Sequence, residues 1–314
     1  MLLPRPAIQR QYVTKSEASR IAVELKGAKA ARSAVLLTIS QRKNMSDVPY
    51  TLGHSESEIR RLMFQAAVVA PITSRLLREA GLARGMRVLD LGCGAGDVAM
   101  LAAEMVGPAG AVVGIDRNAE VLALARSRAR AADHKNIEFR EGSAEDFDDS
   151  MSFDLAIGRH VLTHQADPAA FIRAAASHVR PGGVLAFHEH AIYGGLHSIP
   201  LVPLWKQGGD WIIAFHSVRA HSDAGGRMVE HFHHAGLKPP TMFCEIPVGS
   251  GPDSPIYAWL ALTLRSALPH LEKIGAATAA EVDIDTLADR LRKAVVAAHS
   301  QALGPAQFCG WVRI

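Results

Sequence analysis

The distribution of apolar residues predicts a chain in which short buried strands alternate with helices. Strands are expected in short apolar runs rich in β-branched side chains, at residues 88–91, 111–115, 137–140, 153–157 and 184–187. Helices are expected where apolar positions recur every three or four residues, at residues 98–105, 118–131 and 169–179. Such alternation is typical of an α/β fold with a mostly parallel sheet.

Further elements are predicted on both sides of this alternating core. Before it, Pro71 is expected to separate two helices, because proline disrupts a helix interior but suits a first turn. After it, residues 241–248 and 306–314 have the pattern of strands, with two helices between them, at residues 255–271 and 280–299. The last strand pair is therefore predicted to be interrupted by a helical insertion.

The stretch VLDLGCGAGDVAM at residues 88–100 predicts a strand, a tight loop and a helix start. Its loop contains Gly92, Gly94 and Gly96, which allow positive φ angles and close approach of a ligand to the backbone. A dinucleotide-binding loop has the spacing G-x-G-x-x-G, whereas the spacing here is G-x-G-x-G. Asp90, two residues before the first glycine, favours a ligand that brings a positive charge over one that brings a pyrophosphate.

A second acidic residue stands at the end of the next predicted strand. Asp116 lies about twenty residues beyond the glycine loop, where a carboxylate can bind ribose hydroxyls. Four segments follow one another: VLDLGCGAGDVA, VVGIDRNAEVLALAR, IEFREGSAEDF and FDLAIGRHVLTHQADPAAFIRAAASHVRPGGVLAFHEH. In these motifs the chain resembles the class I S-adenosylmethionine-dependent methyltransferases, in particular the branch of the ubiquinone and menaquinone methyltransferases. The resemblance extends from about residue 50 to the end of the sequence.

The resemblance implies a fold, a cofactor and a set of binding residues. The fold would be a three-layer Rossmann-like sheet, mostly parallel with an antiparallel last strand, with helical insertions as a lid. The cofactor would be S-adenosylmethionine. In related enzymes an acid follows the glycine of the adenine-binding turn, and here Ser143 replaces it. Adenine contact is therefore expected from the backbone of Ala144, with help from the side chain of either Ser143 or Glu145. The cofactor-binding candidates are Asp90, Gly92, Gly94, Gly96, Asp116, Arg117, Ser143, Ala144 and Arg159.

Histidines near predicted strand ends are the candidates for acid–base chemistry. A hydroxyl or an acidic carbon acceptor needs a base, and an ordinary imidazole titrates near neutral pH. Among His160, His164, His188 and His190, we favour His160 and His188 as catalytic residues because both lie near strand ends. His188 and His190 share one face of a strand, but no third ligand has a defined spacing, so no metal site is predicted.

Polar residues that precede the first strand have two interpretations. They either reach the cofactor's amino acid end or the substrate, or they form the solvated face of an amphipathic helix. The residues concerned are Tyr50, His54, Arg61 and Gln65.

Composition and charge narrow the class of protein. The hydrophobic content of 48% is enough for a large core, and no apolar run is long enough to predict a spanning helix. Residues 1–44 hold nine Lys or Arg and two acids, which gives this segment a net charge of +7. The whole sequence has a net charge of +3, so residues 45–314 have a net charge of −4. A mildly acidic body disfavours a nucleic-acid partner held through phosphate contacts. Three cysteines without metal-type spacing fit a reducing compartment.

The domain prediction is a basic extension at residues 1–44 and a methyltransferase domain at residues 45–314, with insertions near 193–224 and 253–300. The extension is interpreted as a mis-assigned start or an appended, disordered tail. A targeting peptide and a basic arm are the alternatives, and the segment lacks a long apolar core and a clear cleavage site. The protein is expected in the cytoplasm, without membrane insertion, and its insertions are compatible with a homodimer.

The favoured function is methyl transfer from S-adenosylmethionine to an oxygen or carbon atom of a small apolar or aromatic molecule. One alternative is a cofactor-binding protein of the same fold with a regulatory or non-methylating role. A nicotinamide oxidoreductase is disfavoured by Asp90 and by the glycine spacing. A macromolecular methylase is disfavoured because residues 157–160 do not match the Asn/Asp-Pro-Pro-Tyr motif of enzymes that methylate amino groups.

Overall fold

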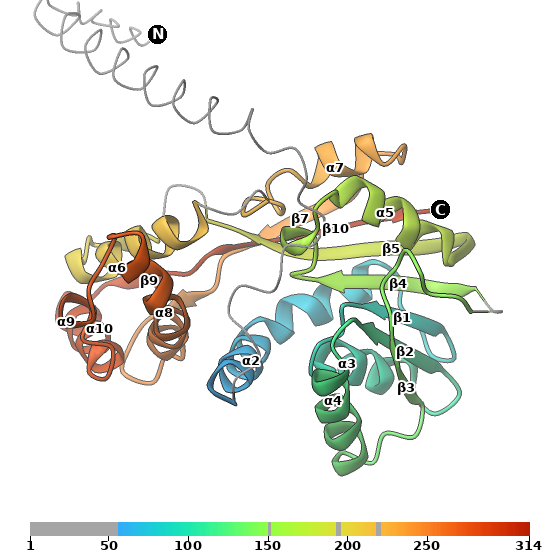
Figure 1. Cartoon of the computed structure of the whole chain (residues 1–314), viewed down its shortest axis with the longest axis horizontal. Coiled ribbons are helices and arrows are strands. Elements are labelled where there is room, and N and C mark those ends of the chain that lie inside the picture. The colour runs from blue at the N-terminus through green and yellow to red at the C-terminus, as the bar shows by residue number, and fades with distance from the viewer. Residues whose placement is uncertain (1–55, 150–151, 193–195, 218–220) are drawn as a thin grey trace, which may run out of the picture. The chain divides into compact units, whose positions relative to one another are not determined.

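A seven-stranded sheet in the order β3-β2-β1-β4-β5-β10-β7 forms the centre of the fold (Figure 1). The computed structural model describes residues 56–149, 152–192, 196–217 and 221–314. The strands are β1 (Arg87–Leu91), β2 (Ala111–Asp116), β3 (Ile137–Glu141), β4 (Phe153–Arg159), β5 (Val179–Ala191), β7 (Thr241–Glu245) and β10 (Ala306–Arg313). Strands β1 to β5 pair in parallel, and β10 runs antiparallel to both of its neighbours. The predicted mostly parallel α/β fold is confirmed.

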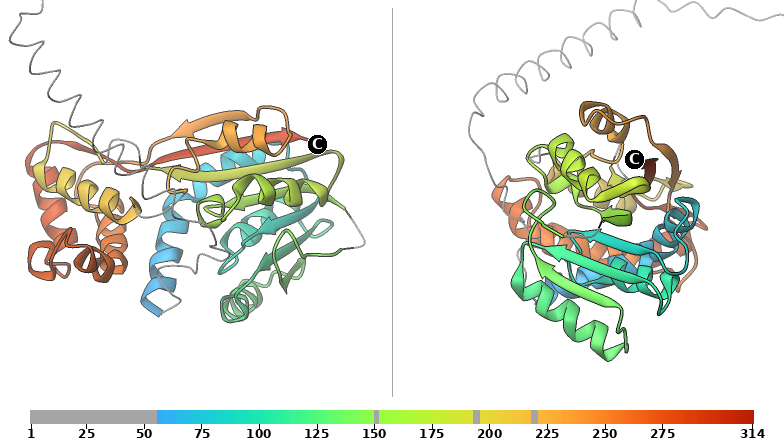
Figure 2. Two further views of the ribbon diagram at one scale, coloured as in Figure 1. Left: turned by 45° about the horizontal axis from the view of Figure 1, so that its top comes forward. Right: turned by 90° about the vertical axis from the view of Figure 1, so that its right-hand side faces the viewer.

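Helices cover both faces of this sheet, as the right-hand view of Figure 2 shows. One face packs against α3 (Asp97–Val106), α4 (Ala119–Ala131) and the end of α2 (Glu56–Glu79). The other face packs against α5 (Pro168–Ser177) and α7 (Met228–His234). The central strands β1, β2 and β4 are apolar because both of their faces are buried, as expected for a parallel sheet.

Helix α2 is longer than the sequence predicts. It runs without interruption from Glu56 to Glu79, with Pro71 inside it, so the prediction of two helices that meet at Pro71 is wrong. Pro71 is exposed, whereas Ile72 and Leu76 on the same helix are buried. Burial of this apolar face offsets the cost of about 3 kcal/mol for an internal proline.

Strand β5 also exceeds its prediction. The Pro181-Gly182-Gly183 segment, which has turn-forming residues, is part of the strand, and the pairing with β4 shifts register there, between Phe153 and Leu155. The strand then continues to Ala191, beyond the point where His188 pairs with Arg159 at the end of β4. This extension carries Glu189 and His190 past the carboxyl edge of the parallel strands.

A separate group of helices lies beyond that carboxyl edge. In Figure 1 and in the left-hand view of Figure 2, α2 lies between this group and strands β1 to β3. We call this group the helical cap: α6 (Pro203–His216), α8 (Ile256–Lys273), α9 (Ala279–Val282) and α10 (Leu287–Ala297). A small antiparallel sheet accompanies it, in the order β6 (Ser198–Ile199), β9 (Gln301–Leu303), β8 (Val248–Gly249). The cap has its own apolar core, which includes Trp205, Tyr257 and Leu264.

The cap interrupts the last strand pair, as predicted. Strands β7 and β10 are hydrogen-bonded neighbours, yet residues 246–305 lie between them and include α8, α9 and α10. None of the helices in the described ranges is both long and apolar enough to cross a membrane.

Candidate active site

The glycine loop lies at the carboxyl end of β1 and is tightly enclosed on two sides. Gly92 has φ 64°, and a Cβ atom there would lie 2.6 Å from Cγ1 of Val161. Gly96 has φ 84°, and its Cβ would lie 2.9 Å from Cζ of Phe139. Gly94, between them, has φ 52°, and a Cβ atom there would meet nothing within 4 Å, so this part of the loop faces open space. Only glycine fits all these conditions.

Asp116 at the end of β2 holds the loop in place. One carboxylate oxygen accepts a hydrogen bond from the backbone N–H of Gly94, and the other accepts one from Asn118, both at 2.9 Å. Asn118 in turn caps α4 through the N–H groups of Glu120 and Val121. Each carboxylate oxygen of Asp116 can accept a second hydrogen bond. The carboxylate therefore has room for the two hydroxyls of a ribose.

Asp90 lies beneath the loop and is almost completely buried, with 1% of its surface exposed. Its Oδ2 atom is buried without a hydrogen-bond partner among the described residues. Burial raises the pKa of Asp90 to about 7, while the positive charge of Arg159 acts in the opposite direction. A buried carboxyl with an unused oxygen suits a ligand that brings a cationic donor.

The predicted adenine-binding turn follows β3. Ser143 and Ala144 are both buried, and the backbone N–H and the hydroxyl of Ser143 donate to the same oxygen of Asp146, at 2.6 and 2.7 Å. The carbonyl of Ala144 accepts a hydrogen bond from Nε2 of His178 at 2.7 Å. The Ser143 hydroxyl oxygen keeps acceptor capacity, so it is able to receive an amino N–H. Asp146 and His178, which the sequence did not single out, fix this turn.

The two predicted arginines lie in different environments. Arg117 is exposed and pairs with Glu145 at 3.5 Å. Arg159, at the end of β4, is half-buried and donates to the Thr73 hydroxyl at 3.4 Å. Burial lowers the pKa of Arg159, and the carboxylates of Asp97 and Asp90 oppose this effect. Arg159 therefore lies close to the buried acid beneath the loop, whereas Arg117 lies at the surface.

His160 and His188 lie side by side and share one hydrogen-bond acceptor. The Oε1 atom of Gln307 is 3.1 Å from Nε2 of each histidine, and Gln307 Nε2 donates to the Pro305 carbonyl at 3.0 Å. The second contact fixes the orientation of the amide, so both rings donate from Nε2. Nδ1 of His188 then accepts from the Thr73 hydroxyl at 3.0 Å.

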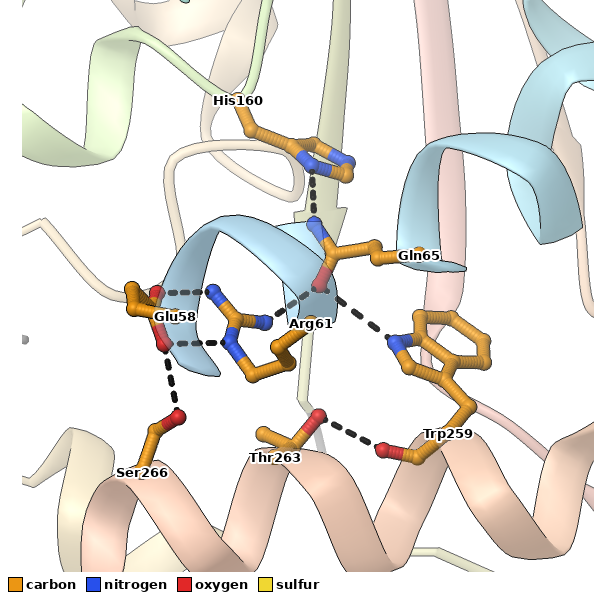
Figure 3. A network of polar contacts seen from close by, with 7 residues as sticks. All are labelled: Glu58, Arg61, Gln65, His160, Trp259, Thr263 and Ser266. Carbon is orange, nitrogen blue, oxygen red and sulfur yellow. Dashed lines mark hydrogen bonds and ion pairs between the residues drawn. The ribbon is translucent and has the colours of Figure 1, made fainter. Parts of the chain in front are cut away.

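Gln65 of α2 occupies the remaining ring nitrogen of His160. Its amide nitrogen is 3.0 Å from Nδ1 of His160, and its oxygen accepts from Nη1 of Arg61 and Nε1 of Trp259 (Figure 3). Two donors on the oxygen fix the amide, so Gln65 donates to His160. Both predicted catalytic histidines thus have both ring nitrogens hydrogen-bonded to the protein, and their catalytic role stays a prediction.

The histidines are neutral at physiological pH. Burial lowers the pKa of His188 to about 3, helped by the charge of Arg159. Burial also lowers the pKa of His160 well below its usual range, with smaller contributions from His190 and His188. Their neutral state agrees with the single tautomer that Gln307 imposes on each ring.

A buried ion pair connects α2 to the helical cap. Arg61 donates to both carboxylate oxygens of Glu58, at 2.8 and 2.6 Å, and Ser266 of α8 donates to Glu58 at 2.6 Å (Figure 3). The side chains of Glu58 and Arg61 are 1% and 6% exposed. The interpretation of Arg61 as part of a solvated helix face is therefore wrong. Tyr50 and His54 lie outside the described residues.

Glu189 holds the turn that carries His160. It is fully buried in β5, and its Oε1 accepts hydrogen bonds from the backbone N–H groups of Val161 and Leu162, at 2.7 and 2.8 Å. His160 itself has φ 55°, an unusual backbone angle for a residue other than glycine. Burial raises the pKa of Glu189 to about 8. Thr73, Glu189 and Gln307 were not predicted as site residues, since the site residues they contact are 27 to 147 residues away in sequence.

Among the described residues, no group of three or more His, Cys, Asp or Glu side chains could hold a metal ion. The residues described above comprise a glycine loop, two acids and the neutral imidazoles of His160 and His188.

The sheet order, the glycine loop and the acids at the ends of β1 and β2 define the class of Rossmann-like methyltransferase folds. In agreement, residues 82–224 match the family model described as "Methyltransferase domain". The resemblance indicated by the four sequence motifs is confirmed over this part of the chain.

Two curated relatives and one solved structure illustrate the similarity. The chain is 40% identical over 138 residues to a ubiquinone biosynthesis O-methyltransferase of Aromatoleum aromaticum, which covers 40% of this chain and 56% of the relative. It is 30% identical over 135 residues to a demethylmenaquinone methyltransferase of Lactococcus lactis, covering 43% and 51%. The chain thus spans about half the length of the curated relatives it matches.

The solved structure is a provisionally assigned methyltransferase of Bacillus halodurans C-125. It is 18% identical, covers 77% of this chain and 97% of its own, and superposes with a TM-score of 0.51. At this level of identity the likeness concerns the fold alone.

Proposed function

We propose that the protein transfers a methyl group from S-adenosylmethionine to an oxygen or carbon atom of a small apolar or aromatic molecule. The observation that carries this proposal is the bond from Gly94 to Asp116, which joins the glycine loop of β1 to the ribose-type acid of β2. The match of residues 82–224 to the methyltransferase domain supports it.

The residues around the loop fit this cofactor. Asp90 has a buried oxygen without a partner among the described residues and would receive the cofactor's ammonium group. Asp116 would hold the ribose hydroxyls, and Ser143 and Ala144 would contact the adenine. Gly94, with open space above it, would allow the ligand to approach the backbone. Arg159 would balance the charge of Asp90, and Arg117 would lie at the rim.

The names of the relatives support the acceptor class. One is a ubiquinone biosynthesis O-methyltransferase and the other a demethylmenaquinone methyltransferase. The apolar core of the helical cap beyond the strand ends is consistent with an apolar or aromatic acceptor. The homodimer, the cytoplasmic location and the absence of a nucleic-acid partner stay predictions.

When bound, S-adenosylmethionine supplies a methyl group on a positively charged sulfur. The protein would act mainly by positioning, because an aligned donor and acceptor need little further activation. The neutral state of His160 and His188 keeps additional positive charge away from this region.

Titration calorimetry with S-adenosylmethionine and S-adenosylhomocysteine tests the proposal. We expect both to bind, and we expect Asp116→Ala to weaken both by about 1–3 kcal/mol, because a charged hydrogen-bond partner of the ribose is lost. Glu104→Ala, which removes an exposed acid at the far end of α3, serves as the control and should bind normally. Failure of the unaltered protein to bind either ligand would refute the proposal.

A further inference from the structure

The turn after β4 places Val161 between two glycines at the ends of neighbouring strands. A Cβ atom on Gly92, just after β1, would lie 2.6 Å from Cγ1 of Val161. A Cβ atom on Gly158, in β4, would lie 2.6 Å from Cγ2 of the same side chain. Both methyl groups of Val161 therefore occupy space that exists only because these two positions lack a side chain. Val161 is 7% exposed, so it forms a buried contact between the turn and the glycine loop.

Val161 restrains the first residue of the glycine loop. Apart from the chain neighbours of Gly92, its atoms are the only ones among the described residues within 4 Å of the Gly92 Cβ position. Further along the loop, the restraint is a different one, because the N–H of Gly94 donates to Asp116 at 2.9 Å. A glycine has more accessible backbone conformations than other residues, so a loop without the Val161 contact would be freer at Gly92.

The backbone of the turn depends on an acceptor from β5. His160 donates its backbone N–H to the His188 carbonyl at 2.8 Å, and its φ of 55° then turns the chain away from β5. The next two N–H groups, of Val161 and Leu162, belong to buried residues and donate to Oε1 of Glu189 at 2.7 and 2.8 Å. Without Glu189 these two donors would be buried and unpaired, which costs free energy comparable to a lost hydrogen bond.

The chemical state of Glu189 suits this contact. Burial raises the pKa of Glu189 to about 8, and the backbone N–H groups of Leu162, Val161 and Thr163 oppose this effect. At pH 7 the side chain is therefore mostly neutral, with one carbonyl oxygen whose two lone pairs match the two N–H groups. A fully buried carboxyl has a cost for folding, and here its hydrogen bonds go to the turn that carries Val161.

We propose that Glu189 is a positioning residue for cofactor binding. It holds the backbone of the turn so that Val161 stays against Gly92, and this contact keeps the glycine loop in the conformation that receives S-adenosylmethionine. This inference rests on the proposed function. It gives a residue of β5 an influence on the loop that follows β1, across the intervening strand β4.

The effect is expected in the affinity for the cofactor. A loop with several conformations binds the ligand in only one of them, so the apparent affinity falls with the population of that conformation. Replacement of Glu189 by alanine removes the acceptor and releases the turn, whereas a side chain that keeps a carbonyl oxygen at the same place should hold it. Loss of the Val161 methyl groups should free the loop in the same way.

Titration calorimetry of the full chain with S-adenosylhomocysteine at pH 7 tests the inference. We expect Glu189→Ala and Val161→Ala each to bind about tenfold more weakly than the unaltered protein. Glu189→Gln should bind within about twofold of it, because the amide is neutral and keeps a carbonyl oxygen with two lone pairs. Thr163→Val is the matched control: it removes a buried hydroxyl of the same turn that has no partner among the described residues, and it should bind normally.

The double variant Glu189→Ala with Val161→Ala distinguishes a route through Val161 from two separate effects. If Glu189 acts through Val161, the second substitution removes a contact that is already lost, so the double variant should also bind about tenfold more weakly. Independent effects would multiply to about a hundredfold and would overturn the inference. Thermal unfolding of each variant shows whether the affinity is measured on folded protein.

The remaining outcomes are also decisive. Normal affinity in Glu189→Ala or in Val161→Ala would overturn the inference, and the result for Val161→Ala counts even if Glu189→Ala does not fold. Equal losses in Thr163→Val and Glu189→Ala would overturn it too, since any disturbance of the turn would then suffice. These results leave the proposed function intact, whereas failure of the unaltered protein to bind S-adenosylhomocysteine would overturn both.

Discussion

At the scale of residues, the acids and glycines of the loop could be predicted from sequence because their spacing within the chain is itself the signal. Asp90, Gly94 and Asp116 lie within 27 consecutive residues and meet at the ends of neighbouring strands. The residues that fix the histidines could not be predicted in this way. Gln307 meets His160 across 147 residues, and no local pattern distinguishes it from a glutamine on any strand.

Asp90 gives a prediction at this scale. Its folded-state pKa is about 7, above the ordinary value of 3.8, so the folded protein keeps a proton that the unfolded chain has lost. Stability therefore falls as the pH rises through this window, and the cost is complete above about pH 7. Asp90→Asn does not titrate, so it should stabilise the ligand-free protein on the order of 2 kcal/mol at about pH 8, with no gain below about pH 4.

Urea unfolding as a function of pH measures this effect, with the exposed Asp133→Asn as the control. The same Asp90 variant should bind S-adenosylmethionine about 1–3 kcal/mol more weakly, because a charged partner of the ammonium group is lost. A stability gain that grows toward acid pH would contradict the assignment of a raised pKa to Asp90.

At the scale of elements, apolar runs predicted the parallel strands well because the central strands β1, β2 and β4 are buried on both faces. The prediction failed at Pro71, where burial of neighbouring apolar residues outweighs local propensity, and at the amino end of β5, where glycine and proline remain in the strand. Helix α2 is the element that joins the site to the cap: it supplies Thr73 to His188, Gln65 to His160 and Glu58 to α8.

The buried ion pair of α2 gives a second prediction. Arg61→Met should destabilise the protein by about 3 kcal/mol, because it leaves the carboxylate of Glu58 buried without its cation. Ser266→Ala removes a single hydrogen bond to the same carboxylate and should cost about 1–2 kcal/mol. Urea unfolding gives both free-energy differences, and hydrogen exchange of the α8 amides shows whether the stability of this helix is lowered. Equal costs for the two variants would argue against a charged Glu58.

At the scale of the whole described chain, the apolar residues form separate clusters for the cap and for the two faces of the sheet. The sequence predicted helical insertions but not that they would form a core of their own, since the cluster joins residues from α2, α6, α8 and α10. Cofactor residues belong to the sheet, and His216 and Trp259 belong to the cap.

This separation predicts that damage to the cap leaves the cofactor site intact. Leu264→Ala, at a fully buried position in the centre of α8, should cost about 2–5 kcal/mol in stability and slow methyl transfer, with little change in affinity for S-adenosylhomocysteine. Leu122→Ala, equally buried in α4 against the sheet, should lower both stability and that affinity. Calorimetry measures the affinity of the two variants for S-adenosylhomocysteine, and thermal unfolding measures their stability. An equal loss of affinity in both variants would show that the cap and the sheet act as one unit.

The position of β10 also bears on how the protein is made. β10 pairs with β5 on one side and with β7 on the other, so it is an interior strand although it follows the other strands of this sheet in the sequence. Until β10 has emerged from the ribosome, β5 presents an open edge, β7 has no partner in the sheet, and Gln307 cannot yet orient His160 and His188. Translation would thus finish the cap before the sheet can close, and this order leaves a growing chain exposed to strand-to-strand association until β10 emerges.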